Sequence, residues 1–187
     1  MSSHIASRLC AAAFASLALA GAASMAQAQV MVGGAPMYAT KDIIDNAVNS
    51  KDHTTLVAAV KAAGLVDTLK GPGPFTVFAP TNAAFSALPA GTVDSLLKPE
   101  NKAMLTTVLT YHVVPGKWDA AALGNLIMDG KGQATIKTVQ GESLTATTQG
   151  GKIILTDAKG GMAHVTTADV YQSNGVIHVV DKVLMPK

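Results

Sequence analysis

The chain has 187 residues and is almost balanced in charge, with 14 Lys plus Arg against 12 Asp plus Glu. This balance gives no electrostatic case for nucleic acid as a partner, because that function needs a strongly basic surface. The chain also holds a single cysteine, so a framework of disulfides is excluded.

The first 28 residues read as an export signal. A short start carries Arg8, an apolar run follows from Leu9 to Ala23, and the small residues of Ala26-Gln27-Ala28 precede Gln29. Export peptidases recognise small residues at such positions. We therefore predict a signal peptide over 1–28 and an exported protein, periplasmic or extracellular. The apolar run is too short and too rich in alanine to serve as a stable membrane anchor.

Removal of this signal would remove Cys10 and the only arginine, Arg8. Thiolate catalysis and cysteine zinc sites are then excluded, and bidentate recognition of phosphate or carboxylate is disfavoured. The remaining length suffices for one domain with a substantial core. Such a domain must be stabilised by packing.

The chain after the signal begins without a regular period. Residues 29–39 contain Gly33-Gly34 and Pro36, so we predict a flexible leader whose Met and Val side chains can still dock. From Thr40 the pattern becomes helical, and Thr40 is the predicted cap. The apolar face of this first helix holds Ile43, Ile44, Ala47 and Val48. Further helical segments are predicted from about Asp52 to Gly64, over 65–70, after Thr81, over 92–97 and from Pro99.

A strand passes directly into a helix within residues 75–88. Residues 75–79 are apolar or β-branched on both alternating sets, which favours a strand covered on both faces. Pro80 cannot donate a ladder hydrogen bond and is predicted to stop the strand. Thr81 then occupies the N-cap position, where its hydroxyl can accept from a free N–H of the first helical turn.

The second half of the chain is predicted to be rich in strands. Tyr111-His112-Val113-Val114 predicts a short strand that ends at Pro115-Gly116. Five more strands are predicted over 135–139, 143–148, 152–156, 163–170 and 176–180. Asn174-Gly175 and Gly150-Gly151 are typical of two-residue hairpins. Helices followed by antiparallel strands indicate an α+β domain over 40–187.

Several of these segments resemble the signature stretches of fasciclin domains. The resemblance rests on three separated motifs in the family's order: Phe78, Pro80, Thr81, Asn82 and Phe85; then Tyr111 and His112; then Asn174, Gly175 and His178. It spans roughly residues 40–186. It implies a wedge-shaped β-sandwich packed with several short helices. It also implies a role in cell adhesion or in contact with the extracellular matrix.

The resemblance further implies a partner-binding role for Tyr111 and His112, which match the Tyr-His motif of the family. The residues themselves favour a structural role first. On a strand the two side chains would point to opposite faces, and the neighbouring valines predict that both faces are covered. Trp118 is the aromatic residue most open to a partner or a sugar. Its ring could equally lie over the edge of the domain.

We predict no catalytic, cofactor or metal site. The sequence has no GxSxG elbow, and Glu100 and Glu142 lie far apart. The histidines after the signal, none of them at helical ligand spacing, are His53, His112, His164 and His178. We expect a non-catalytic module that contacts a protein or a surface component.

A second hypothesis is a periplasmic binding protein for a small apolar ligand. It requires a pocket lined by residues such as Met104, Met128 and Met162. A cavity above ~300 Å³ with converging polar groups would support it, whereas a filled core would support the interaction module.

Overall fold

The structure is a computed structural model that describes residues 30–187, so the predicted signal peptide lies outside the described residues. Seven strands form one sheet in the order β4-β3-β9-β8-β7-β6-β5. Their bounds are β3 Phe75–Pro80, β4 Val113–Pro115, β5 Gln133–Lys137, β6 Ser143–Gln149, β7 Lys152–Thr156, β8 Met162–Gln172 and β9 Gly175–Val180.

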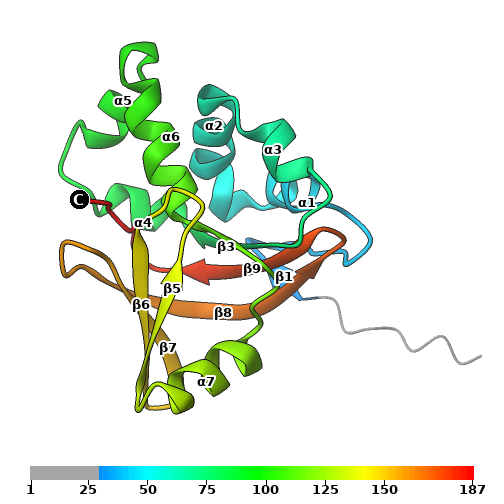
Figure 1. Cartoon of the computed structure of the whole chain (residues 1–187). Coiled ribbons are helices and arrows are strands. Elements are labelled where there is room, and N and C mark those ends of the chain that lie inside the picture. Colours follow the sequence, from blue (N-terminus) through cyan, green and yellow to red (C-terminus); the bar gives the residue numbers. More distant parts are fainter. Residues whose placement is uncertain (1–29) are drawn as a thin grey trace, which may run out of the picture.

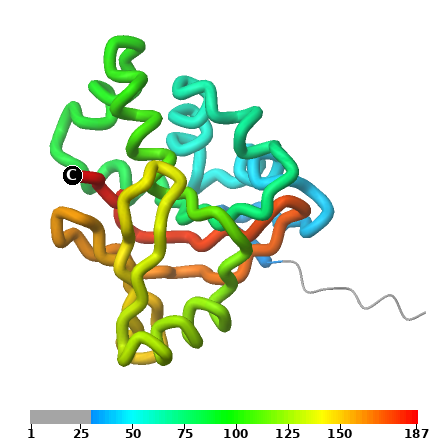
Figure 2. Tube along the Cα trace, viewed as in Figure 1, coloured from blue at the N-terminus to red at the C-terminus, as the bar shows by residue number. Residues whose placement is uncertain are grey.

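The sheet is mixed and nearly closed. β3 pairs in parallel with β9, and the other neighbours pair antiparallel. Just beyond β5, the backbone N–H of Val139 donates to the carbonyl of Val113 in β4 at 2.8 Å. The two outer strands of the sheet are thereby brought together. Figure 2 shows the β8–β9 hairpin running across the whole width of the molecule.

Seven helices accompany the sheet in the described part of the chain: α1 Ile43–Asn49, α2 Thr54–Ala63, α3 Val66–Lys70, α4 Asn82–Ser86, α5 Thr92–Leu97, α6 Lys102–Tyr111 and α7 Ala120–Asp129. Two short 3₁₀ turns, η1 Lys51–His53 and η2 Pro99–Asn101, precede α2 and α6. Figure 1 shows α1 to α6 gathered on one side of β3 and β9, with α7 at the opposite end, where it packs against β5 and β6. The predicted α+β class is confirmed.

The sheet separates two clusters of buried apolar side chains, and β3 shows how. Val77 and Ala79 belong to the cluster under the helical layer, whereas Phe78 belongs to the cluster enclosed with α7. Alternate residues of a strand point to opposite faces, so a strand buried on both faces must be apolar throughout. The two-sided burial predicted for this strand is confirmed.

The passage from β3 into α4 is also confirmed. Pro80 is the last residue of β3 and lies opposite Val180 of β9. Thr81 follows in an extended conformation and caps α4, because its Oγ1 accepts from the backbone N–H of Ala84 at 3.2 Å. A side chain at this position satisfies one of the free N–H groups of a helix N-terminus.

Residues 30–39 differ from the flexible leader that the sequence predicts. β1 Met31–Val32 and β2 Ala35–Pro36 form a small antiparallel hairpin. The side chains of Val32 and Met37 are buried in the helical-side cluster. This segment has no hydrophobic period because it buries single side chains rather than a continuous face.

The first helix begins later than the sequence predicts. Its N-cap is Asp42 rather than Thr40, because the Asp42 carboxylate accepts from the backbone N–H of Asp45 at 2.8 Å. The buried face also differs, since Val48 is exposed and Asn46 is buried. Asn46 replaces an apolar contact with hydrogen bonds to both backbone groups of Tyr38 and to the side chain of Gln172. Burial of a polar side chain requires such partners.

Candidate functional site

Tyr111 ends α6 instead of starting a strand, so the predicted strand at 111–114 begins two residues too early. The helix extends through Tyr111, and the N–H of the C-cap residue His112 closes its last turn by bonding to the carbonyl of Leu109 at 3.1 Å. The Tyr111 side chain is 0% exposed. Its hydroxyl donates to the carbonyl of Ser143 at 3.3 Å and accepts from the N–H of Ala158 at 3.0 Å. Burial raises the pKa of this hydroxyl above its ordinary value.

His112 is buried on the other side, among the residues under the helical layer. Its Nδ1–H donates to the carbonyl of Val108 at 2.6 Å, and its Nε2 accepts from the N–H of Leu184 at 2.9 Å. Both bonds are made by one neutral tautomer. Burial lowers the pKa of His112 to about 4, although the bond to Val108 acts in the opposite direction. The burial predicted for Tyr111 and His112 is confirmed, and neither side chain offers a free polar atom to a partner.

Trp118 lies at the edge of the domain with its ring half-buried. Its Nε1–H donates to the carbonyl of Pro115 at 3.1 Å. The neighbouring Lys117 places its Nζ 4.8 Å from the centre of the Tyr171 ring, and that tyrosine is 40% exposed. We call Lys117, Trp118 and Tyr171 the Trp118 surface. It combines two aromatic rings, the kind of side chain that is enriched where proteins bind partners, with a lysine that lies over one of them.

His178 lies beneath this surface and is fully buried. Its Nε2–H donates to the carbonyl of Trp118 at 2.6 Å, and its ring stacks on Phe78 with centroids 5.6 Å apart. The N–H of Asp169 lies 3.4 Å from the remaining ring nitrogen. Burial lowers the pKa of His178, so the ring is neutral near pH 7. His178 and Phe78 therefore hold the loop that carries Trp118.

Asn174 and Gly175 connect the β8–β9 turn to the helical layer. The Asn174 Oδ1 accepts from the N–H of Ile43 at 3.1 Å, and its Nδ2 donates to the carbonyls of Leu69 at 2.6 Å and Gly71 at 3.2 Å. A Cβ at Gly175 would clash with the backbone oxygen of Phe75, so this close approach requires glycine.

Asn82 makes a similar connection at the start of α4. Its Oδ1 accepts from the N–H of Thr55 at 3.0 Å, and its Nδ2 donates to the carbonyl of Lys51 at 2.8 Å. The amide thereby caps α2 from a position 27 residues later in the chain. Phe85, the last residue of the first motif, is buried in the helical-side cluster.

Two histidine pairs were not predicted from the sequence. Ser50 Oγ lies 2.9 Å from His53 Nδ1, and both side chains are buried. Their i, i+3 spacing across a helical turn was the signal for this pair. His164 Nδ1 lies 3.0 Å from Asp181 Oδ2 at the surface, through a strand pairing that no local pattern indicates. Within residues 30–187, no three His, Cys, Asp or Glu side chains come close enough to hold a metal ion.

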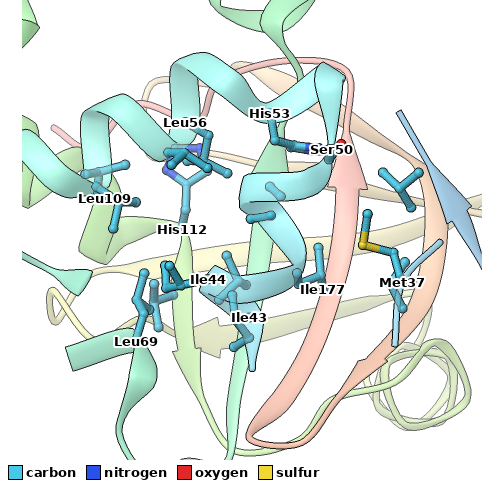
Figure 3. A pocket seen from close by; sticks show the side chains of 18 residues that line it. Met37, Ile43, Ile44, Ser50, His53, Leu56, Leu69, Leu109, His112 and Ile177 are labelled. Atoms are coloured by element: carbon cyan, nitrogen blue, oxygen red, sulfur yellow. Dashed lines mark hydrogen bonds between the residues drawn. The ribbon is translucent and has the colours of Figure 1, made fainter. Parts of the chain in front are cut away.

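A small cavity lies between the N-terminal segment, α2 and the sheet (Figure 3). Its volume is about 30 Å³, roughly the space of one water molecule. None of the three methionines of the ligand-binding hypothesis lines it, because Met104, Met128 and Met162 are 58%, 77% and 54% exposed. That part of the hypothesis is wrong. The cavity also falls well below the ~300 Å³ expected of a ligand pocket.

A second hollow, of about 350 Å³, is open to solvent beside α4 and α5. Thr55, Asn82 and Phe85 contribute to its wall. The Asn82 amide is fully engaged with α2 and its preceding turn, so it is not available to a ligand. The Ser86 hydroxyl likewise donates to the Asn82 carbonyl at 3.0 Å, so the hollow offers few free polar groups to fix a small molecule.

A mixed, nearly closed sheet with short helices is the fold of a fasciclin domain. The family described as "Fasciclin domain" matches residues 51–186, and the chain belongs to this family. A solved structure of an insect FAS1 domain pair, from the cell adhesion molecule fasciclin I, shares the fold with a TM-score of 0.68 and 17% sequence identity. The match covers 78% of this chain and 51% of that one.

Bacterial relatives are closer in sequence. Protein sll1483 of Synechocystis is 51% identical over 144 residues, which cover 77% of this chain and 73% of the relative. Immunogenic protein MPT70 of Mycobacterium tuberculosis is 43% identical over 145 residues, which cover 75% of this chain and 66% of the relative. Several relatives are thus longer than the shared region. Among residues 30–187, no helix has the length and apolar character that crossing a membrane requires.

Proposed function

We propose that this chain is an exported, non-catalytic fasciclin-like module for cell adhesion or for binding an extracellular surface or matrix component. The observation that carries the proposal is the family match over residues 51–186. Names of relatives point the same way: one similar protein is a cell surface glycolipoprotein, MPB83 of Mycobacterium bovis, and the insect structure comes from a cell adhesion molecule. The partner is a protein or a surface component in the periplasm or outside the cell.

The absence of catalysis is part of the proposal. The Ser50 hydroxyl, which pairs with His53, is buried and out of reach of a substrate. A nucleophile needs its activating base and also access to the reacting atom. The exposed His164 and Asp181 pair has a base and an orienting carboxylate, and no hydroxyl is hydrogen-bonded to that imidazole among the described residues.

We propose that the Trp118 surface contacts the partner and that Tyr111 and His112 act only by stabilising the domain. Tyr111 and His112 are buried, and every polar atom of their side chains is bonded within the domain. The Trp118 surface, in contrast, can be reached by a partner. Trp and Tyr are among the few residue types that dominate binding energy at an interface.

Export is tested by the intact mass of the protein recovered from the periplasm or the medium. We expect a chain that begins at Gln29, since Ala26-Gln27-Ala28 supplies the small residues before the cleavage site. A retained N-terminus, or a lipid-sized mass increment on Cys10, would contradict the export proposal.

Adhesion is tested by binding of fluorescently labelled protein to the cells that produce it and to their extracellular matrix. The double variant Lys117→Ala/Tyr171→Ala should lose about tenfold or more in affinity with little change in unfolding midpoint. The matched control is Lys131→Ala/Met128→Ala, which removes an exposed cation and an exposed apolar side chain at the other end of α7. Equal binding by both double variants would exclude the Trp118 surface, and no binding by the parent protein would contradict adhesion.

A further inference from the structure

Asn174 is the only asparagine of the chain that is followed by a glycine. An asparagine in this position is prone to deamidation, because glycine has no side chain to hinder its backbone nitrogen or to restrict its conformation. The nitrogen of the glycine attacks the side-chain carbonyl carbon of the asparagine, and ammonia leaves. The cyclic succinimide that forms then takes up water and opens to aspartate or isoaspartate. The dipeptide alone therefore marks Asn174 as a reactive site.

The fold holds the Asn174 amide in an orientation that opposes this reaction. Its Oδ1 accepts from the N–H of Ile43, and its Nδ2 donates to the carbonyls of Leu69 and Gly71. The oxygen and both N–H donors of the amide are thus bonded to the start of α1 and to the end of α3. Figure 1 shows the β8–β9 turn beside these two helices. The three bonds must break before the amide can turn toward the nitrogen of the next residue.

Gly175, which carries the attacking nitrogen, is also fixed. It is buried, pairs with Gln172 across the hairpin and pairs with Phe75 in the parallel ladder. The carbonyl of Asn174 accepts from the N–H of Phe75 at 3.0 Å. A Cβ on Gly73 would clash with the same carbonyl, so the backbone of the turn packs directly on the segment before β3. The backbone rotation that ring closure requires is therefore blocked while the turn is in place.

The products of deamidation do not fit this turn. Aspartate has no N–H in its side chain, so the carbonyls of Leu69 and Gly71 would lose their donor and face a negative charge. Acceptors that lose their partner inside a fold destabilise it. Isoaspartate also adds a methylene to the backbone, where the turn already contacts Gly73 and Phe75. A modified chain therefore cannot rebuild the contacts of the native turn.

We propose that Asn174 is a deamidation site that reacts only in molecules whose β8–β9 turn has separated from α1 and α3, and that the reaction makes this opening irreversible. Water is the co-reactant, ammonia is released, and the side chain gains one negative charge. Native domains open locally and close again. Chemical modification of the open form removes it from this equilibrium, so the site limits the lifetime of the folded domain. The proposal does not depend on the adhesion function.

The first test compares the rate of deamidation in the folded protein with the rate in urea, at one mildly alkaline pH. The tryptic peptide 160–182 contains Asn174 and no other asparagine, so its increase in mass reports on this site. Deamidation should be at least ~tenfold slower in the folded protein, because the rate follows the population of opened molecules. The free peptide, with and without urea, controls for an effect of urea on the chemistry. Equal rates in the folded and unfolded protein would overturn the proposal.

The second test asks whether modified chains refold. Partly deamidated protein is diluted from urea, folded and unfolded chains are separated by size-exclusion chromatography, and peptide 160–182 is analysed in each fraction. The modified peptide should be depleted from the folded fraction, with the unmodified chains of the same sample as the control. Asn174→Asp should unfold at a lower urea concentration than the parent or fail to fold. Asn125→Asp adds the same charge at an exposed position in α7 and should keep the midpoint of the parent. Modified chains that refold to the stability of the parent would overturn the proposal.

Discussion

The imidazole of His112 accepts a hydrogen bond from the backbone N–H of Leu184, 2.9 Å away and 72 residues later in the chain. The bond fastens the segment after β9 to the junction of α6 and β4. Tyr111, the preceding residue, joins the same junction to β6 and to the turn between β7 and β8. The Tyr-His motif thus connects segments that the sheet alone does not hold together.

His112→Ala should destabilise the domain by ~1 to 3 kcal/mol, because the Leu184 N–H and the Val108 carbonyl lose their buried partner. Adhesion should fall only as far as the folded fraction falls. The measurement is partner binding at a temperature where circular dichroism shows the variant fully folded. Binding lost under those conditions, at unchanged structure, would make the motif a direct contact.

Thr81→Ala should lower the free energy of unfolding by ~1 kcal/mol without a change of fold, since it removes the cap that Ala84 donates to. Urea midpoints at equal slope would measure the loss. Ser95→Ala, at an exposed position inside α5, is the control and should leave stability equal or slightly higher. An unchanged midpoint for Thr81→Ala would show that the Thr81 cap does not stabilise the domain.

Asn174→Ala should cost more, about 2 to 3 kcal/mol, because three backbone groups lose the amide that links the β8–β9 turn to α1 and α3. The matched control is Asn125→Ala, which removes an amide side chain from an exposed position in α7. Hydrogen exchange at Ile43 should also accelerate in the first variant alone. Similar stabilities for both variants would show that water replaces these bonds.

Local patterns predicted those parts of the fold that local physics determines. The cap at Thr81 and, to within two residues, the strand boundaries after residue 140 follow from side-chain type and turn residues. The predicted turn at Asn174-Gly175 is wrong by one residue, because Gly175 already pairs with Gln172 and the turn consists of Ser173 and Asn174. The sequence of Tyr111-His112-Val113-Val114 is typical of a strand, yet α6 continues through Tyr111. The hydrogen bond to the Leu109 carbonyl and the burial of the Tyr111 side chain outweigh the preference of these residues for a strand.

Contacts between distant segments could not be predicted in this way. Nothing near Asn174 in the sequence indicates that its amide reaches Ile43, 131 residues earlier. The hairpin over 31–36 also lacks a pattern, because Val32 and Met37 bury as isolated side chains. The same limit applies to the cavity at His53, whose walls come from several separate elements. Residue type predicted candidates such as Trp118, and only the fold shows which of them are accessible.

Acid should weaken the domain well above the pH at which its carboxylates protonate. The pKa of His112 is about 4 in the folded state and about 6.5 in an unfolded chain, so the unfolded state binds more protons between these values. Stability therefore falls as pH falls through this window, by about 2 kcal/mol between pH 7 and pH 5 for this residue. Burial also lowers the pKa values of His53 and His178, which act in the same direction.

Urea unfolding at pH 7, 6 and 5 measures this loss. His112→Gln should be less stable than the parent at pH 7. It should lose less stability toward pH 5, because the largest of the three histidine contributions to the pH dependence is gone. Thr81→Ala is the control, since it weakens the domain without removing a titrating group and should keep the full pH dependence. A parent protein equally stable at pH 7 and pH 5 would contradict the prediction. That result would require His112 to find an acceptor for its second proton beside Leu184, where the structure places a backbone donor.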